Sequence, residues 1–217
     1  QGALVEVRRS NELQQSEQAR YQKSQASVQA MANGTIDAEV NRLGRAAGTT
    51  TSSFLNAYSY YTTGLLHELL GEENDAFIDY RKAAQIAPDN PYLQQDLVRI
   101  AKKLSMPQYE EFQRRWGDAP LAKPGQGQVV VLVERGFVPE KQSFTVPFRI
   151  DGNWQTASLA TYPPQRATMS AGEITGFGTV LRAAPLANID ALAITALKEE
   201  LPSALIRQAA RVYAKAE

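Results

Sequence analysis

Residues 56–91 decide the fold, and they read NAYSYYTTGLLHELLGEENDAFIDYRKAAQIAPDNP. Apolar residues recur at steps of three and four on both sides of Gly71, which predicts two amphipathic helices. Gly71 tolerates the left-handed conformation that ends a helix, so the first helix is expected to end there. The second is expected to end before Pro88, because the residue that precedes a proline disfavours the helical conformation. The stretch offers no defensible set of catalytic groups, and it favours an interaction module.

A loop is expected over residues 44–53, because glycines at 44 and 48 lead into a run of threonine and serine. The helical pattern begins at Phe54. Either Ser52 or Ser53 is predicted to cap this helix by accepting a hydrogen bond from an exposed backbone N–H.

Seven positions of the central stretch resemble a tetratricopeptide repeat: Tyr60, Gly64, His67, Ala76, Tyr80, Ala83 and Pro88. They match its large, small, large, small, aromatic, small and proline positions, in a repeat of about 34 residues. Small residues at 64 and 76 let the two helices approach closely, and Tyr80 fills the space between them. The sequence departs from the repeat at Thr63, where an aliphatic residue is usual, and at His67, where an aromatic one is usual. The resemblance covers one unit.

One repeat cannot bury its own apolar face, so neighbouring helices must complete the stack. Asn90 and Pro91 predict the start of a helix over 91–104, because asparagine caps helices and proline fits their first turn. A short helix over 108–116 is expected to end at the glycine that follows it. The polar segment 4–32 predicts a long surface helix. That helix could also be the second arm of a hairpin that begins before this sequence, or it could pair with another chain.

The pattern changes after residues 118–127, a linker rich in glycine and proline. Four strands are predicted, at 128–134, 143–150, 154–162 and, more weakly, 173–181. The first is expected to be buried because it is apolar throughout, whereas the second alternates and carries Pro147, which indicates an edge strand. A helix is predicted from Ile189 onward, broken or kinked at Pro202.

These elements predict an α+β fold in three parts. A TPR-like helical bundle or short solenoid is expected over 1–117, followed by the linker at 118–127. Residues 128–217 are expected to form a small, mainly antiparallel β-unit with C-terminal helices.

The composition excludes several classes of site. The 217 residues include 23 basic and 23 acidic side chains, so no net charge recruits nucleic acid or anionic lipid. The chain has no cysteine, and its one histidine cannot supply most zinc sites or Ser-His pairs. No apolar run approaches the roughly 20 residues that span a bilayer. We therefore expect no catalytic site, no metal, no cofactor and no nucleic-acid partner.

Polar residues near the first interhelix turn allow two interpretations. His67 stands among leucines and is expected to be a packing or rim residue. The acids Glu68, Glu72, Glu73 and Asp75 could bind a cation or act as acid and base. Acids at a helix start are also what the helix dipole favours, and we prefer this structural account.

A partner-binding groove is predicted from aromatic residues between 58 and 116, about half of which must fill the core. The candidate residues are Asn56, Tyr60, Tyr92, Gln94, Gln95 and Arg99. Near the C-terminus, Arg207, Arg211 and Lys215 recur at four-residue steps and are expected to form a solvated helix face. An acidic partner or a membrane surface is the alternative for that row.

The order of segments resembles a family of bacterial envelope proteins, on residues 5–11, 56–96, 127–147 and 189–215. Its members are typically lipoproteins with a repeat-like helical region, a β-unit and a C-terminal helix. The resemblance implies a periplasmic location and an outer-membrane anchor in the full-length protein, but no activity. In such proteins a lipid-bearing cysteine lies near the mature N-terminus. Because the sequence begins at Gln1, we expect a piece of a longer protein whose anchor precedes it and makes its only membrane contact.

Three hypotheses about function follow. The first is a non-enzymatic adaptor of the bacterial envelope that binds a protein segment on its repeat-like helices. The second is a ligand-binding or cell-wall-active protein with a site between the helical and β parts, where Glu134, Glu140, Asp151 and Glu173 could meet. The third is an architectural subunit of an envelope assembly.

Overall fold

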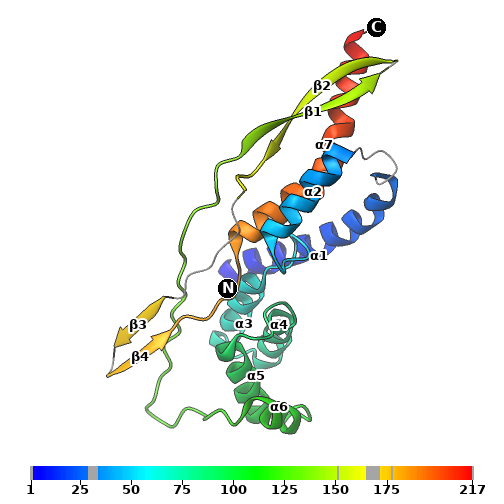
Figure 1. The fold of residues 1–217 in the computed structure, drawn as a ribbon. Coiled ribbons are helices and arrows are strands. Elements are labelled where there is room, and N and C mark those ends of the chain that lie inside the picture. The colour runs from blue at the N-terminus through cyan, green and yellow to red at the C-terminus, as the bar shows by residue number, and fades with distance from the viewer. Residues whose placement is uncertain (1, 29–33, 151, 165–171, 177, 217) are drawn as a thin grey trace. The chain divides into compact units, whose positions relative to one another are not determined.

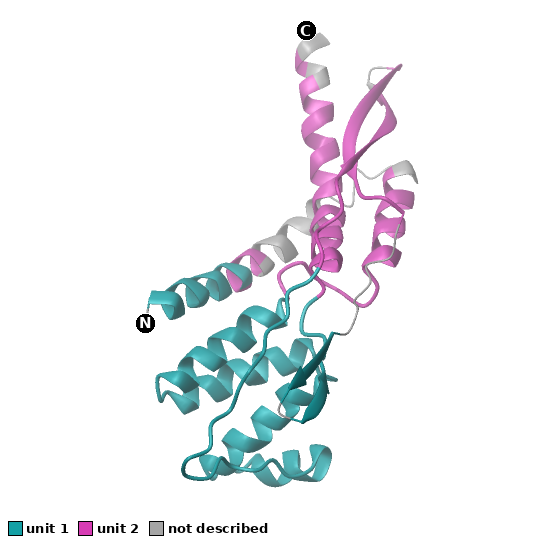
Figure 2. Ribbon diagram, turned by 90° about the vertical axis from the view of Figure 1, so that its left-hand side faces the viewer, with its two compact units in different colours: residues 1–14, 56–135, 169–187 teal, residues 15–55, 136–168, 188–217 magenta. Residues whose placement is uncertain are grey.

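The structure of the protein is a computed structural model that describes residues 2–28, 34–150, 152–164, 172–176 and 178–216. Over these residues the fold is mixed α+β, with seven helices and two small antiparallel sheets (Figure 1). The chain forms two compact units, and each is assembled from three separate stretches (Figure 2). Unit 1 contains Gln1–Gln14, Asn56–Arg135 and Met169–Ala187, and unit 2 contains Gln15–Leu55, Gly136–Thr168 and Asn188–Glu217. These units differ from the expected division at 118–127, because helix α2 packs with the last helix rather than with the central stretch.

Unit 1 is built on four consecutive helices: α3 (Ala57–Leu69), α4 (Glu73–Ile86), α5 (Pro91–Lys103) and α6 (Tyr109–Trp116). Each packs against the next, and together they bury one apolar cluster that includes Tyr80, Leu93, Leu97 and Ile100. The two helices predicted on either side of Gly71 are confirmed, and this glycine has the expected positive φ of 77°. The first half of α1 (Gly2–Val28) also belongs to this unit.

The helix ends in unit 1 follow side-chain chemistry. Asn90 caps α5 as predicted, since its Oδ1 accepts hydrogen bonds from the backbone N–H groups of residues 92 and 93. Gly117 ends α6 with φ 87°, also as predicted. The expected cap at Ser52 or Ser53 is wrong, because α3 begins three residues after Phe54 and Asn56 accepts from the Tyr58 N–H instead.

Unit 2 contains α2 (Gly34–Ala47), α7 (Ile189–Ala216) and a hairpin of β1 (Gln142–Ile150) and β2 (Asn153–Thr161). Its core joins all four elements and includes Ile36, Leu43, Val146, Ile194 and Leu201. The start of the loop expected over 44–53 is wrong, because α2 is helical to Ala47 and includes Gly44, whereas residues 48–53 form neither helix nor strand, as expected. Helix packing outweighs the helix propensity of one glycine here.

The predicted strands have mixed outcomes. Strands over 143–150 and 154–162 are confirmed as the antiparallel β1 and β2, with Pro147 on a strand of a two-stranded sheet. The buried strand over 128–134 is wrong, because this segment is exposed and forms no ladder with any described residue. The single strand over 173–181 is a hairpin of β3 (Glu173–Gly176) and β4 (Thr179–Arg182), and it belongs to unit 1. Glycine at 178, with φ 74°, allows the turn.

The predictions for the two longest helices, α1 and α7, have different outcomes. Helix α1 is confirmed as far as Val28, and residues 29–32 of the expected range lie outside the described residues. A break or a kink is expected at Pro202, and the break is wrong, because α7 continues through this residue, with Leu197, Leu201 and Leu205 buried on both sides. None of the described helices is long and apolar enough to cross a bilayer.

Candidate functional site

Three of the six predicted groove residues serve the fold of unit 1. Asn56 caps α3, and Tyr60 is buried in the helical core. Arg99 donates to the carboxylates of Glu68 on α3 and of Asp96 on its own helix α5, so its guanidinium is already paired within unit 1.

The other three groove candidates lie in the first turns of α5. The Tyr92 hydroxyl donates to the carbonyl of Arg182 at 2.6 Å, and the Gln94 amide donates to the carbonyl of Pro88 at 2.7 Å. Gln95 is exposed. No described contact tests the groove itself, which stays a prediction.

A buried polar network joins α3, α4 and α5 through Arg99. Its guanidinium donates to Asp96 Oδ1 at 2.8 Å and to Glu68 Oε2 at 2.9 Å. Tyr61 donates its hydroxyl to Asp96 Oδ2 at 2.8 Å, and Tyr80 donates to Glu68 Oε2 at 3.1 Å. Burial raises the pKa of Tyr61 and of Tyr80, and the neighbouring carboxylates raise both further. Each described donor has its acceptor, so this network is structural.

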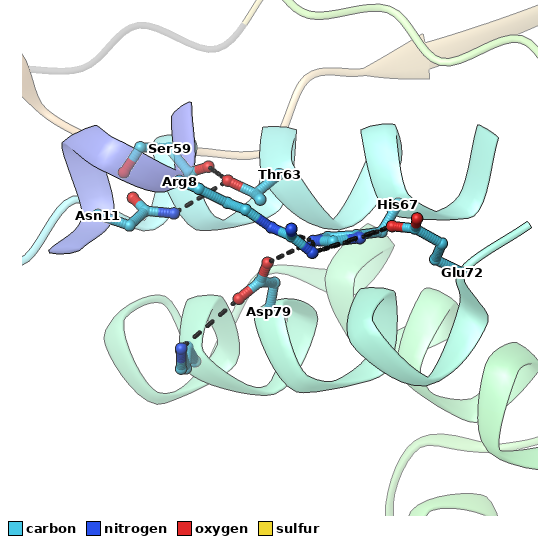
Figure 3. Close-up of polar contacts among 8 residues, drawn as sticks. Arg8, Asn11, Ser59, Thr63, His67, Glu72 and Asp79 are labelled. Atoms are coloured by element: carbon cyan, nitrogen blue, oxygen red, sulfur yellow. Dashed lines mark hydrogen bonds and ion pairs between the residues drawn. The ribbon is translucent and has the colours of Figure 1, made fainter. Parts of the chain in front are cut away.

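A second polar group lies on one face of α3 and consists of Ser59, Thr63 and His67 at four-residue steps (Figure 3). The Ser59 hydroxyl donates to the carbonyl of Asn56 at 3.0 Å, and the Thr63 hydroxyl donates to the carbonyl of Ser59 at 2.7 Å. Their protons are therefore used within the helix, and their oxygen lone pairs remain free to accept. We call Ser59, Thr63 and His67 the acceptor face of α3.

Helix α1 places three donors along this acceptor face. Gln14 Nε2 donates to Ser59 Oγ at 3.1 Å, and Asn11 Nδ2 donates to Thr63 Oγ1 at 2.9 Å. Arg8 Nε donates to His67 Nε2 at 3.2 Å. Donors at steps of three on one helix thus meet acceptors at steps of four on the other, as expected for two helix faces in contact.

His67 is buried, and its neighbours define which nitrogen carries the proton. Nδ1 lies 2.6 Å from Glu72 Oε2, which can only accept while ionised, so Nδ1 is the donor. Nε2 is then free to accept from Arg8. Asp79 Oδ2 lies 3.7 Å from the same Nε2, and burial raises the pKa of Asp79 against the opposing effect of Lys82, His67 and Arg8. The carboxyl groups of Glu72 and Asp79 thus both lie beside His67, at the end of the acceptor face nearest Arg8.

His67, Glu72 and Asp75 offer one nitrogen and two carboxylate oxygens that all lie within 4.8 Å of one another. The surroundings disfavour a cation. Arg8 already brings positive charge, 3.9 Å from Glu72 Oε2, and the first turn of α4 contributes the positive end of its dipole. We therefore assign this set to helix contact rather than to a metal.

The contact between α1 and the acceptor face is polar and incompletely satisfied. Leu4 is the buried apolar residue of the first half of α1, while Val5 and Leu13 are exposed. Two buried oxygens, Asn11 Oδ1 and Gln14 Oε1, have no hydrogen-bond partner among the described residues. A buried unpaired polar atom costs about 1–3 kcal/mol. Such a contact holds a helix in place less firmly than an apolar one.

The acidic residues proposed to form a site between helices and strands are exposed wherever the structure describes them. Glu134, Glu140 and Glu173 are exposed, and Asp151 lies outside the described residues. Glu134 accepts from the Tyr58 hydroxyl at 2.7 Å, and Glu173 pairs with Arg182 in its own hairpin.

The basic row on α7 is only partly described. Arg207 donates to Glu200 Oε1 at 3.1 Å, and Arg211 is exposed. The side chain of Lys215 lies outside the described residues. The expectation of a solvated helix face therefore fits Arg207 and Arg211.

Sequence reasoning missed the acceptor face. One signal was present: Thr63 and His67 stand where the repeat pattern has apolar residues, four positions apart on one helix face. Two consecutive departures on one face indicate a polar contact there. The donors on α1 gave no signal, because arginine, asparagine and glutamine are ordinary on a surface helix.

Comparison of the chain with protein-family models, with curated proteins and with solved structures finds no match.

Proposed function

We propose that the protein is a non-enzymatic adaptor that binds a helical segment of a protein partner on the acceptor face of α3. One observation carries this proposal. Ser59, Thr63 and His67 present hydrogen-bond acceptors toward α1, and side chains of α1 donate hydrogen bonds to all three. A partner helix with arginine, asparagine or glutamine at the same spacing would make the same contacts. The first half of α1 then acts as an occupant supplied by the chain itself.

Resemblance supports the setting of this adaptor. The TPR-like spacing agrees with the close packing of α3 on α4, and TPR proteins present concave helical faces to peptides. The proposed periplasmic location and outer-membrane anchor rest on the resemblance to the envelope family alone. In this proposal the protein has no nucleic-acid partner and no cofactor, and it contacts a membrane only through its anchor.

The proposal is tested by freeing the acceptor face in the whole chain. Arg8→Glu places a carboxylate beside Glu72 and Asp79, so α1 should leave the face by charge repulsion. Arg9→Glu is the matched control, because this substitution makes the same charge change one residue away, at an exposed position. Circular dichroism must first show that both variants keep their helices.

A labelled peptide of residues 2–17 with the natural sequence then serves as the probe in fluorescence anisotropy. The Arg8→Glu chain should bind it at least about tenfold more tightly than the Arg9→Glu chain, whose own α1 competes at high effective concentration. Adding Thr63→Val to Arg8→Glu should weaken binding about fivefold, the effect of roughly one hydrogen bond. If the folded Arg8→Glu chain does not bind the peptide, the proposal that the acceptor face binds a helix is refuted.

Capture from a bacterial envelope extract tests the adaptor role itself. Arg8→Glu should retain more of one protein than the natural sequence does, and the added Thr63→Val should reduce that amount. If none of these chains retains any protein, the adaptor proposal fails even where the peptide binds.

A further inference from the structure

Residues 128–134, QVVVLVE, form an extended apolar segment at the surface of unit 1. The exposed fractions of Val129, Val131 and Val133 are 74%, 51% and 43%. On the opposite side, Val130 and Leu132 are 40% and 37% exposed. Valine and leucine at this density favour a β-strand, yet no backbone hydrogen bond joins the segment to another described residue. Its N–H and C=O groups are thus available to a second strand.

We propose that this segment pairs with the same segment of a second copy of the chain, as two antiparallel strands related by a twofold axis at Val131. In this register Val129 lies opposite Val133 of the second copy, Val130 opposite Leu132, and Gln128 opposite Glu134. Every apolar residue meets an apolar one, and the two polar ends meet each other. A shift by one residue would place either Glu134 opposite Val129 or Gln128 opposite Val133, depending on its direction.

Charge disfavours the in-register parallel arrangement. An in-register parallel pair would place Glu134 beside Glu134 and Arg135 beside Arg135 of the second copy, which is destabilising. The antiparallel pair separates these like charges. A twofold axis also gives a closed dimer, because both copies use the same strand edge.

The nearest alternative occupant is strand β3 of the same chain. Val133 approaches it, since its Cγ1 lies 3.9 Å from the position that a Cβ on Gly172 would take. Strand β3 has four residues, two of which are Glu173 and Thr175, so it is shorter and more polar than the segment. A second copy matches the segment in both length and polarity.

Cysteine pairing tests the register, because the chain has no natural cysteine. Directly opposed residues of antiparallel strands have Cα atoms about 4.5–5.5 Å apart, which a disulfide can bridge. Val131→Cys should therefore form a disulfide with itself under mild oxidation. Val130→Cys is the matched control, because its counterpart in the second copy is displaced by two residues. A mixture of separately tagged Val130→Cys and Leu132→Cys chains should form the mixed disulfide.

The expected result is that Val131→Cys dimerises at least about tenfold faster than Val130→Cys at equal concentration. Sedimentation of the natural chain should show a weak, reversible dimer, since seven paired residues make a small interface. Equal rates for the two cysteines would overturn the proposal. A strict monomer whose amides at 128–134 resist hydrogen exchange would also overturn it, because the segment would then pair within its own chain.

Discussion

The ring of Tyr80 lies directly against the backbone of Gly64. A Cβ added to Gly64 would lie 2.6 Å from both Cδ1 and Cε1 of that ring. The ring cannot easily move, because it is fully buried and its hydroxyl donates to Glu68. The close approach of α3 to α4 therefore depends on Gly64 having no side chain.

Gly64→Ala should destabilise unit 1 by about 1–3 kcal/mol, the usual result of overpacking a core. Helix propensity alone would make Gly64→Ala stabilising, because alanine is more favourable than glycine within a helix by about 1 kcal/mol. A measured loss of stability would therefore come from the contact with Tyr80. Urea unfolding followed by Trp116 fluorescence measures the effect, with Trp154→Phe in every chain to remove the other tryptophan.

Gly44→Ala is the matched control for Gly64→Ala. Its added Cβ, on α2, would meet Lys198 Cδ of α7 at 3.7 Å, which is an ordinary van der Waals contact. The free energy of unfolding of unit 2, followed by circular dichroism, should stay the same or rise. If both alanines had the same effect, the close approach at Tyr80 would not control helix packing.

Arg99→Ala should destabilise unit 1 by roughly 3–5 kcal/mol, because it leaves two poorly exposed carboxylates without their cation. Lys103→Ala is the comparison, since Lys103 is half exposed and pairs with Glu73 at the surface. Lys103→Ala should lower the free energy of unfolding by less than about 1 kcal/mol. Urea titration of both variants checks the difference, and equal losses would contradict a structural role for the Arg99 network.

On acidification, the contributions of Glu68 and Asp79 to the free energy of unfolding should change in opposite directions. Burial alone would raise the pKa of Glu68, but the hydrogen bonds and charge of Arg99 hold it below the ordinary 4.5. Folding thus favours the ionised form, and this stability is lost as the pH falls below about 4.5 through the lower folded-state pKa. Burial raises the pKa of Asp79 above the ordinary 3.8, so its unfavourable contribution appears as the pH rises from that value.

Glu68→Gln should therefore flatten the loss of unfolding free energy on acidification, and Asp79→Asn should steepen it. Urea titrations at half-unit pH steps from 3 to 7 measure the two slopes against the natural chain. Changes of the same sign in both variants would contradict the assigned pKa directions.

Arg42→Lys should destabilise unit 2 although it keeps the charge. The Arg42 guanidinium donates at 2.7 Å both to Thr161 Oγ1 and to the Tyr162 carbonyl, and it pairs with Glu39. It thereby joins α2 to the end of β2, and a lysine cannot reproduce the planar fork. A loss of about 1–2 kcal/mol is expected in thermal unfolding. Arg45→Lys, at an exposed position of the same helix, should leave the melting temperature unchanged.

Local rules predicted the parts of the chain where one residue decides the backbone. Gly71, Asn90 and Gly117 end or begin helices through their own side-chain or backbone properties, and all three predictions are confirmed. The alternation of apolar residues over 143–150 likewise predicted β1, because one face of that strand meets a core.

Predictions failed where distant contacts outweigh local preference. Gly44 lies within α2 because Ile36 and Leu43 of the same helix pack on α7, far away in sequence. The segment 128–134 was expected to be buried because it is apolar, but burial needs a partner, and no described part of the chain covers it. The acceptor face was missed for the same reason, since its donors lie more than 40 residues away, as in the Asn11–Thr63 pair with its separation of 52.

The pairing of α2 with α7 has a consequence for synthesis on the ribosome. Leu43 and Leu201 share one core but are 201 − 43 = 158 residues apart. At about 5–20 residues per second, α2 emerges roughly 8–30 seconds before the helix that covers it. During that time its apolar stripe is accessible to chaperones, and the order of translation leaves unit 2 incomplete until α7 has been made.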